Sequence, residues 1–260
     1  MGSYKVTFAS FSDKIASSRL RASIPQKELE KLGIKRGRDI LVYGKHIIQT
    51  NQTGAFRKKI YDVCDDHYSD SLAAYYLEHT ERADLVTCNS EAMKSIIGRT
   101  TGRNARVIPD PYESEERPAG MGDGLFWFGH QSNLKTLEPY QDLNIKTLTG
   151  DEWSRIKQLQ ELERCALVVL PTDNRQAKSA NRLIETVRNG RFCVCGPLPA
   201  YEEFKDFMWV GDVREGIEWA LSHKPEVIER IKACQEYIKE RYSPSTIAKQ
   251  WLSVLEEVWH

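Results

Sequence analysis

The chain has 260 residues, 40% of them hydrophobic and 28% charged, which fits one large domain or two of ordinary size. Its formal net charge is zero, which argues against a strongly basic surface coated by nucleic acid. No apolar run is long enough to span a membrane and residues 1–11 do not read as a signal peptide, so we expect a cytoplasmic protein.

Charge is unevenly divided along the chain. Residues 1–112 hold 18 Lys and Arg against 13 Asp and Glu, whereas residues 113–260 hold 19 against 24. Two basic patches, at 35–38 and 57–59, lie in the first half. They indicate either a surface that attracts an acidic partner, such as a phosphate, a nucleic acid or an anionic lipid, or an ordinary solvated surface.

The first half alternates predicted strands and helices. Strands are expected at 5–10, 39–43, 59–66, 83–90 and 106–111, and helices at 17–33, 71–82 and 91–97. This alternation favours a parallel sheet with crossover helices.

The second half repeats the pattern after a break. Residues 113–122 are charged, contain Pro and Gly and are poor in apolar residues, so we predict a linker there. Further strands are expected at 125–129, 144–150, 165–171, 192–196 and 207–211. Two alternating halves predict an α/β protein with two Rossmann-like domains. The six cysteines include no CxxC pair, and we expect buried thiols such as Cys193 and Cys195 in a reducing compartment.

The last predicted helix is strongly amphipathic. Ser243 suits its N-cap and Pro244 its first position. Its apolar stripe must dock on something, and we expect it to pack across both domains; the stripe consists of Ile247, Trp251, Leu255 and Val258.

A polar helix face follows the buried strand at 165–171. On a helical wheel this face holds Lys178, Asn181, Arg182 and Glu185, and the opposite face holds Ala180, Leu183, Ile184 and Val187. We predict Ser179 as the N-cap and Gly190 as the C-terminal stop.

This helix begins where a doubly wound sheet binds ligands, beyond the carboxyl ends of the strands. Its first N–H groups, with Lys178 and Arg182, favour a diphosphate. Glu185, about 10 Å further along the axis, suits sugar hydroxyls. The order fits a nucleotide diphosphate carrying a sugar. The alternative is a solvent-exposed face with ion pairs between residues four apart.

Several segments, in their order and spacing, resemble the GT-B fold glycosyltransferases, especially the retaining family four, also called group 1. They are SSRLR at 17–21, ADLVTCNSEAM at 83–93, RVIPDPYE at 106–113, LFWFGHQSNLKTL at 125–137, the run at 165–204 and the closing helix at 240–259. Glu185 and Gly190 keep the five-residue spacing of the family's donor signature. Ala177 stands where the family often has a second glutamate, which leaves the retaining outcome open.

The resemblance implies a short, divergent GT-B chain whose two parallel sheets face each other across a cleft. Residues 1–112 would form the acceptor domain and 123–240 the donor domain, joined by the linker at 113–122. Residues 241–260 would cross back to the first domain. The activity implied is transfer of a hexose from a nucleotide-diphosphate sugar to a hydroxyl acceptor, with no metal and no cofactor.

Donor-binding candidates surround the predicted helix and the loop after the strand at 125–129. In that loop His130 is either a group that covers the phosphates or an ordinary loop residue. The full set is Gly129, His130, Asn133, Lys178, Ser179, Asn181, Arg182 and Glu185.

Acceptor and catalytic candidates lie in the first domain. Asp65, Asp66 and His67 follow a strand end, where they either orient or deprotonate an acceptor hydroxyl or cap the next helix. Ser18, Arg19 and Arg21 follow the first strand. The two arginines either bind an acceptor phosphate or form surface charge.

Three alternatives stay open. One is a nucleotide-sugar epimerase of the same fold, and another is a non-catalytic nucleotide-binding module, marked by Ala177. The third concerns the acceptor, which is a glycan, a lipid-linked molecule met by peripheral membrane contact, or DNA with modified bases.

Overall fold

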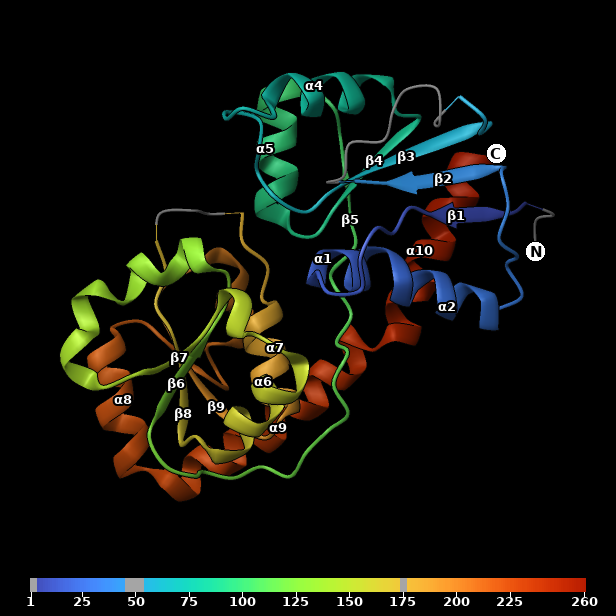
Figure 1. Ribbon diagram of the computed structural model, residues 1–260. Helices are drawn as coiled ribbons and strands as arrows, with labels where there is room; N and C mark the ends of the chain where they lie inside the picture. The colour runs from blue at the N-terminus through green and yellow to red at the C-terminus, as the bar shows by residue number, and fades with distance from the viewer. Residues whose placement is uncertain (1–3, 45–53, 174–176) are drawn as a thin grey trace. The chain divides into compact units, whose positions relative to one another are not determined.

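A computed structural model describes residues 4–44, 54–173 and 177–260 (Figure 1). The chain divides into two compact units. Unit 1 comprises Met1–Pro111 and Arg241–His260, and unit 2 comprises Tyr112–Glu240. Residues 113–122, predicted to be a linker, are therefore part of unit 2. The final helix belongs to unit 1.

Unit 1 contains a five-stranded parallel sheet in the order β1-β2-β3-β4-β5. Its strands are β1 (Val6–Phe8), β2 (Ile40–Tyr43), β3 (Lys58–Val63), β4 (Leu85–Cys88) and β5 (Arg106–Val107). Each strand is shorter than the segment predicted for it. Strand β3 begins one residue earlier than predicted, and the other four lie within their predicted segments. Every residue of β2 and β4 is buried, as expected for a parallel sheet covered on both faces.

Helices flank both faces of this sheet (Figure 1). They are α1 (Ala16–Ser18), a π-helical turn η1 (Arg19–Ser23), α2 (Ile24–Lys31), α4 (Ala73–Arg82), α5 (Glu91–Thr101) and α10 (Pro244–Trp259). In place of the single helix predicted at 17–33, the structure has α1, the π turn η1 and α2 in direct succession. Such turns are frequent at functional sites, and this one carries Arg21.

The closing helix α10 completes the core of unit 1. All four residues of its predicted apolar stripe are at most 6% exposed, and Trp251 meets Phe8 edge-on with ring centroids 4.9 Å apart. Ser243 accepts a hydrogen bond from the Thr246 N–H, which confirms the predicted N-cap. The stripe belongs to the core cluster of unit 1, with residues of β1, β2 and α2.

Unit 2 contains a second five-stranded parallel sheet, in the order β10-β9-β8-β6-β7. The strands are β6 (Leu125–Phe128), β7 (Lys146–Leu148), β8 (Leu167–Leu170), β9 (Phe192–Cys195) and β10 (Trp209–Val210). Because β7 and β8 lie on opposite sides of β6, the strand order reverses between β6 and β8. In open α/β sheets this reversal marks the ligand-binding crevice.

The helices of unit 2 include α6 and α7 on one side of the sheet and α8 on the other (Figure 1). The α-helices are α6 (Arg155–Arg164), α7 (Asn181–Arg188), α8 (Val213–Ser222) and α9 (Lys224–Tyr242), and the 3₁₀ helices are η2 (Gln131–Leu143), η3 (Gly150–Glu152) and η4 (Pro199–Phe204). Gly190, with φ of +72°, ends α7 as predicted. A Cβ atom there would also collide with the Pro118 carbonyl oxygen, so this glycine lets residues 117–120 approach closely.

Five of the six cysteines are buried and Cys64 is half-buried, and the expected burial of Cys193 and Cys195 is confirmed. Within the described ranges, no helix is long and apolar enough to cross a bilayer.

Candidate functional site

A cavity in unit 2, with about 280 Å³ of open space including solvent, lies where the strand order of its sheet reverses. Its lining comes from η2, from the segment after β8, from α7 and from the start of η4. The lining residues are Asn133, Thr136, Pro171, Thr172, Asp173, Lys178, Arg182, Leu198 and Tyr201. Three predicted donor-binding residues, Asn133, Lys178 and Arg182, therefore share one cavity.

Two residues of β6 hold Arg182 in place. It lies in the first turn of α7, its Nη1 donates to the Phe128 carbonyl at 3.3 Å, and its guanidinium lies 5.7 Å from the Trp127 ring centre. A Cβ atom at Gly129 would lie 3.1 Å from that Nη1, so the glycine leaves room for the guanidinium. Arg182 itself is half-buried, so it retains access to the cavity.

The helix start differs from the prediction. Helix α7 begins at Asn181, and its N-cap is Ala180 rather than Ser179. Because alanine has no polar side chain, the N-cap residue itself cannot satisfy the first N–H groups of α7. Ser179 and Asn181 are half-buried and are not part of the cavity lining.

The loop after β6 contributes one of its three candidates to the cavity. Asn133 is 9% exposed and lines the cavity. Gly129 is not part of the lining but lies next to the Arg182 guanidinium. His130 is exposed, and its Nδ1 accepts the Ser132 N–H at 3.2 Å as the N-cap of η2. Capping of η2 accounts for the position of the His130 side chain, as in the alternative of an ordinary loop residue. No contact among the described residues supports the prediction that His130 covers phosphates.

The contacts of Glu185 oppose its predicted role as a ribose acceptor. Its side chain is buried and its Oε1 accepts the N–H groups of Glu113 and Ser114 at 3.1 and 3.3 Å. Its Oε2 accepts the Ser114 hydroxyl at 2.5 Å and Arg155 Nη2 at 3.0 Å. A carboxylate has about four acceptor positions, and these four donors fill them. Glu185 therefore anchors the segment predicted to be the linker.

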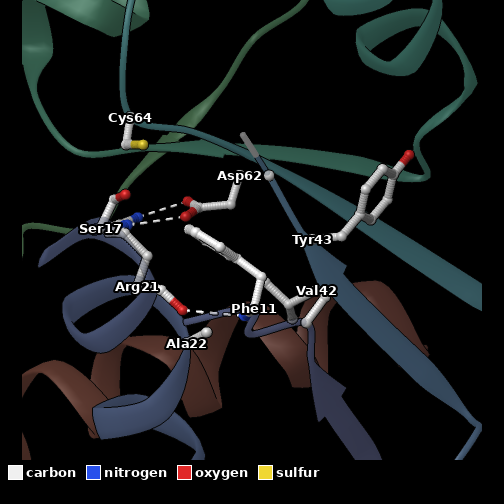
Figure 2. Close-up of a pocket in the computed structure, with 11 residues that line it drawn as sticks. Phe11, Ser17, Arg21, Ala22, Val42, Tyr43, Asp62 and Cys64 are labelled. Carbon is white, nitrogen blue, oxygen red and sulfur yellow. Dashed lines mark hydrogen bonds and ion pairs between the residues drawn. The ribbon is translucent and has the colours of Figure 1, made fainter. Parts of the chain in front are cut away.

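The second cavity lies in unit 1, at the carboxyl ends of β1, β2 and β3, and has about 350 Å³ of open space (Figure 2). It is lined by Ala9, Phe11, Ser17, Ser18, Arg21, Ala22, Val42, Tyr43, Gly44, Asp62 and Cys64. Two of the predicted acceptor-binding residues, Ser18 and Arg21, are among them.

Arg21 forms a buried ion cluster, which opposes its predicted role in binding an acceptor phosphate. Its Nε and Nη2 donate to both oxygens of Asp62 at 2.9 and 2.5 Å (Figure 2). Its Nη1 donates to the Ile108 carbonyl and to Asp110 at 2.5 and 3.1 Å. Burial lowers the pKa of Arg21, but the adjacent Asp62 and Asp110 carboxylates raise it above its ordinary value overall. The guanidinium is thus charged, and it donates four hydrogen bonds to protein oxygens.

Ser18 and Arg19 shape the loop that borders this cavity. The Ser18 hydroxyl accepts the N–H groups of Phe11 and Ser12 at 3.2 and 3.4 Å. Arg19 Nη1 donates to the Asp13 carbonyl at 2.6 Å. Both side chains hold the loop closed on itself, which is a different task from the predicted contact with an acceptor.

The predicted catalytic trio lies beyond the cavity lining. Asp66 accepts the Tyr68 N–H at 3.2 Å, and His67 Nδ1 lies 2.6 Å from Asp70 Oδ2. The hydrogen bond from His67, with that from the Leu72 N–H, lowers the pKa of Asp70. Asp65 lies 3.9 Å from the Cys64 thiol. These contacts favour the alternative that the trio builds the turn before α4.

Sequence reasoning missed several lining residues. Phe11, Asp62 and Cys64 in unit 1 and Tyr201 in unit 2 were not predicted. One signal was available for Asp62: an acid inside the apolar run of β3 must find a buried partner. Nothing in the local sequence singles out Phe11 or Tyr201, because both read as ordinary apolar positions.

Solved structures share this architecture at low sequence identity. Anabaena HepE in complex with UDP-glucose aligns with a TM-score of 0.70 and 15% identity over 97% of this chain and 99% of HepE. A UDP-forming α,α-trehalose-phosphate synthase from Burkholderia vietnamiensis aligns with a TM-score of 0.60 and 10% identity over 97% of this chain and 82% of the synthase.

TarM aligns with a TM-score of 0.56 and 12% identity over 85% of this chain, which spans only 54% of TarM. No family model and no curated protein sequence matches the chain. The similarities establish the predicted two-unit GT-B fold. Membership of the retaining family four stays a prediction.

The Arg21 cluster predicts a large stability loss in Arg21→Met. Removing the cation leaves Asp62 and Asp110 buried without their partner, which should cost about 3–5 kcal/mol in the free energy of unfolding. Urea denaturation measures the loss. The control Arg19→Ala, at a partly exposed position, should lose far less, and equal losses would contradict the assignment.

The Glu185 network predicts that Glu185→Ala weakens unit 2 itself. Loss of the carboxylate leaves the Ser114 hydroxyl and the two N–H groups without an acceptor, at a cost of about 1–3 kcal/mol. Thermal unfolding without ligand tests this, with the exposed Glu218→Ala as control. An unchanged melting temperature would restore Glu185 as a candidate ligand contact.

Proposed function

We propose that the chain transfers a sugar from a nucleotide-diphosphate sugar to a hydroxyl acceptor, with unit 2 binding the donor. The observation that carries the proposal is the pairing of Lys178 and Arg182 in one cavity at the reversal point of the unit 2 sheet. The fold shared with HepE, whose structure is described as a complex with UDP-glucose, supports the same assignment.

The chemistry required of the site is stabilisation of a leaving diphosphate. As the bond between the anomeric carbon and the diphosphate oxygen breaks, negative charge grows on that oxygen. Preorganised cations and N–H groups lower the free energy of such a transition state. Arg182 offers a planar fork suited to two phosphate oxygens, and Lys178 offers a point charge.

Tyr201 adds a neutral donor to this cavity. Burial is the main cause that raises the pKa of its phenol above the ordinary value. The hydroxyl therefore keeps its proton throughout the neutral range and does not add negative charge beside the diphosphate. The start of α7 supplies the positive end of the helix dipole nearby.

We propose that transfer is independent of a metal ion, because Lys178 and Arg182 supply two positive charges at the point where a metal would otherwise act. The resemblance to family four adds retention of the anomeric configuration to the proposal. Cytoplasmic location also stays part of it.

A second candidate function is nucleotide binding without transfer. One observation favours it: Ala177 and Glu185 mark the family's two acidic positions, and neither offers a carboxylate to a ligand. Ala177 is buried and Glu185 is consumed within unit 2. The nucleotide-sugar epimerase has no such supporting observation.

Arg182→Ala should weaken binding of a nucleotide-diphosphate sugar about 10- to 100-fold, because a hydrogen bond to a charged group contributes about 1.5–3 kcal/mol. Lys178→Ala should act in the same direction. The measurement is thermal shift with UDP-, ADP- and GDP-glucose, since stabilisation grows with ligand concentration over Kd. Lys205→Ala, an exposed cation of unit 2 outside the cavity, is the charge-matched control. Equal binding by all three variants would refute the donor site.

Incubation with the nucleotide sugar that binds, without acceptor, separates the functions. A transferase should release the nucleoside diphosphate slowly, and chelator should not change that rate. An epimerase would convert one sugar nucleotide into another, and a binding module would leave the compound intact. NMR of the mixture distinguishes these outcomes, and loss of release on adding chelator would contradict the metal-independent proposal.

A further inference from the structure

The Arg182 guanidinium is contacted from two elements other than its own helix. From β6, the Phe128 carbonyl accepts a hydrogen bond from Nη1 at 3.3 Å, and the Trp127 ring centre lies 5.7 Å away. From η4, the Tyr201 side chain forms a hydrogen bond with Arg182. Because arginine has donors and no acceptor, the phenol oxygen of Tyr201 accepts this bond. Tyr201 therefore adds a contact to Arg182 that β6 does not supply.

Tyr201 is fixed to the fold independently of Arg182. The residue is 1% exposed, and its N–H donates to the Leu198 carbonyl at 2.8 Å at the start of η4. The segment before η4 is tied to the segment after β8, because Thr172 Oγ1 donates to the Pro197 carbonyl at 2.8 Å. The phenol oxygen is thus an acceptor whose position is set by the protein.

The Arg182 side chain needs such an acceptor more than its backbone does. Helix α7 fixes the backbone, and the Arg182 carbonyl also accepts the Thr186 hydroxyl at 2.7 Å. The long side chain beyond Cα has many rotamers, and each contact that selects one of them lowers the entropy lost on binding. No described carboxylate forms an ion pair with Arg182, so these contacts orient its charge without neutralising it.

We propose that Tyr201 is a positioning residue for Arg182, whose guanidinium it holds in the orientation that receives the diphosphate oxygens. The inference rests on the proposed function, because it requires a diphosphate in this cavity. Displacement of a group that stabilises a transition state by about 1 Å can cost about 100-fold in rate. A single hydroxyl that fixes the guanidinium therefore affects both affinity and rate.

A double-mutant cycle on the full chain tests the coupling between the two residues. Tyr201→Phe keeps the ring and should weaken binding of the nucleotide sugar about three- to tenfold, the contribution of one hydrogen bond. In the Arg182→Ala background the same substitution should change the affinity less than about twofold, because the group that Tyr201 orients is gone. Isothermal titration calorimetry with UDP-, ADP- and GDP-glucose measures the dissociation constants.

Tyr140→Phe is the matched control. Tyr140 also lies beside an arginine of unit 2, with Arg214 5.6 Å from its ring centre, and it is outside the cavity lining. This substitution should leave the affinity for every nucleotide sugar unchanged. Melting temperatures without ligand check that each variant is folded.

The rate of nucleoside diphosphate release at saturating nucleotide sugar separates positioning from a purely structural role. Tyr201→Phe should lower this rate at least as much as it lowers the affinity, because the charge that Arg182 meets is largest in the transition state. A purely structural residue would lower the melting temperature and leave the saturated rate of the folded protein unchanged. If the chain releases no nucleoside diphosphate, the binding cycle alone decides.

Two results would overturn this inference and leave the donor site intact: Tyr201→Phe binds as tightly as the unaltered chain, or its loss adds in full to that of Arg182→Ala. If the unaltered chain binds none of the three nucleotide sugars, the proposed function fails and this inference fails with it. The two failures are therefore distinguishable.

Discussion

A charge removed from water must be satisfied inside the fold, and this constraint assigns roles to the polar residues of both units. An unpaired buried ion costs several kcal/mol, so the chain surrounds each one with partners. Arg21 in unit 1 and Glu185 in unit 2 are the clearest cases, at 6% and 7% exposure. Arg21 donates four hydrogen bonds to protein oxygens, and Glu185 accepts four from protein donors.

The same constraint identifies the groups that are left to bind a ligand. Arg182 is half-buried and is held by a carbonyl, by the Tyr201 hydroxyl and by an indole ring, and no described carboxylate forms an ion pair with it. Its charge is therefore oriented without being neutralised, which is the condition for stabilising an anion. In the cavity of unit 1, by contrast, Arg21 is paired with the carboxylates of Asp62 and Asp110. The two cavities thus differ in how their arginine is held.

Much of the fold could be predicted from the sequence because apolar runs and their spacing determine it. The strands of both sheets, the amphipathic final helix and the end of α7 at Gly190 followed from such patterns. The Lys178 and Arg182 pair followed from position at a strand's carboxyl end. The burial of individual charges could not be predicted from these patterns. Arg21 pairs with Asp62, 41 residues away, and Glu185 bonds to Ser114, 71 residues away. A helical wheel records which face a residue is on, but not which distant segment covers it.

The coverage of α7 by residues 113–120 explains the most instructive failure. A charged, Pro- and Gly-containing stretch reads as a linker, yet Ser114 is buried on Glu185 and Asn189. Arg188 also lies 4.2 Å from the Tyr112 ring centre and pairs with Glu116. The polar face of α7 is therefore divided along its length: its first turn, with Arg182, borders the cavity, while its later turns bind the chain's own segment. A signature read along one helix combines residues with two different surroundings, because Arg182 lines the cavity whereas Glu185 bonds to residues 113–114.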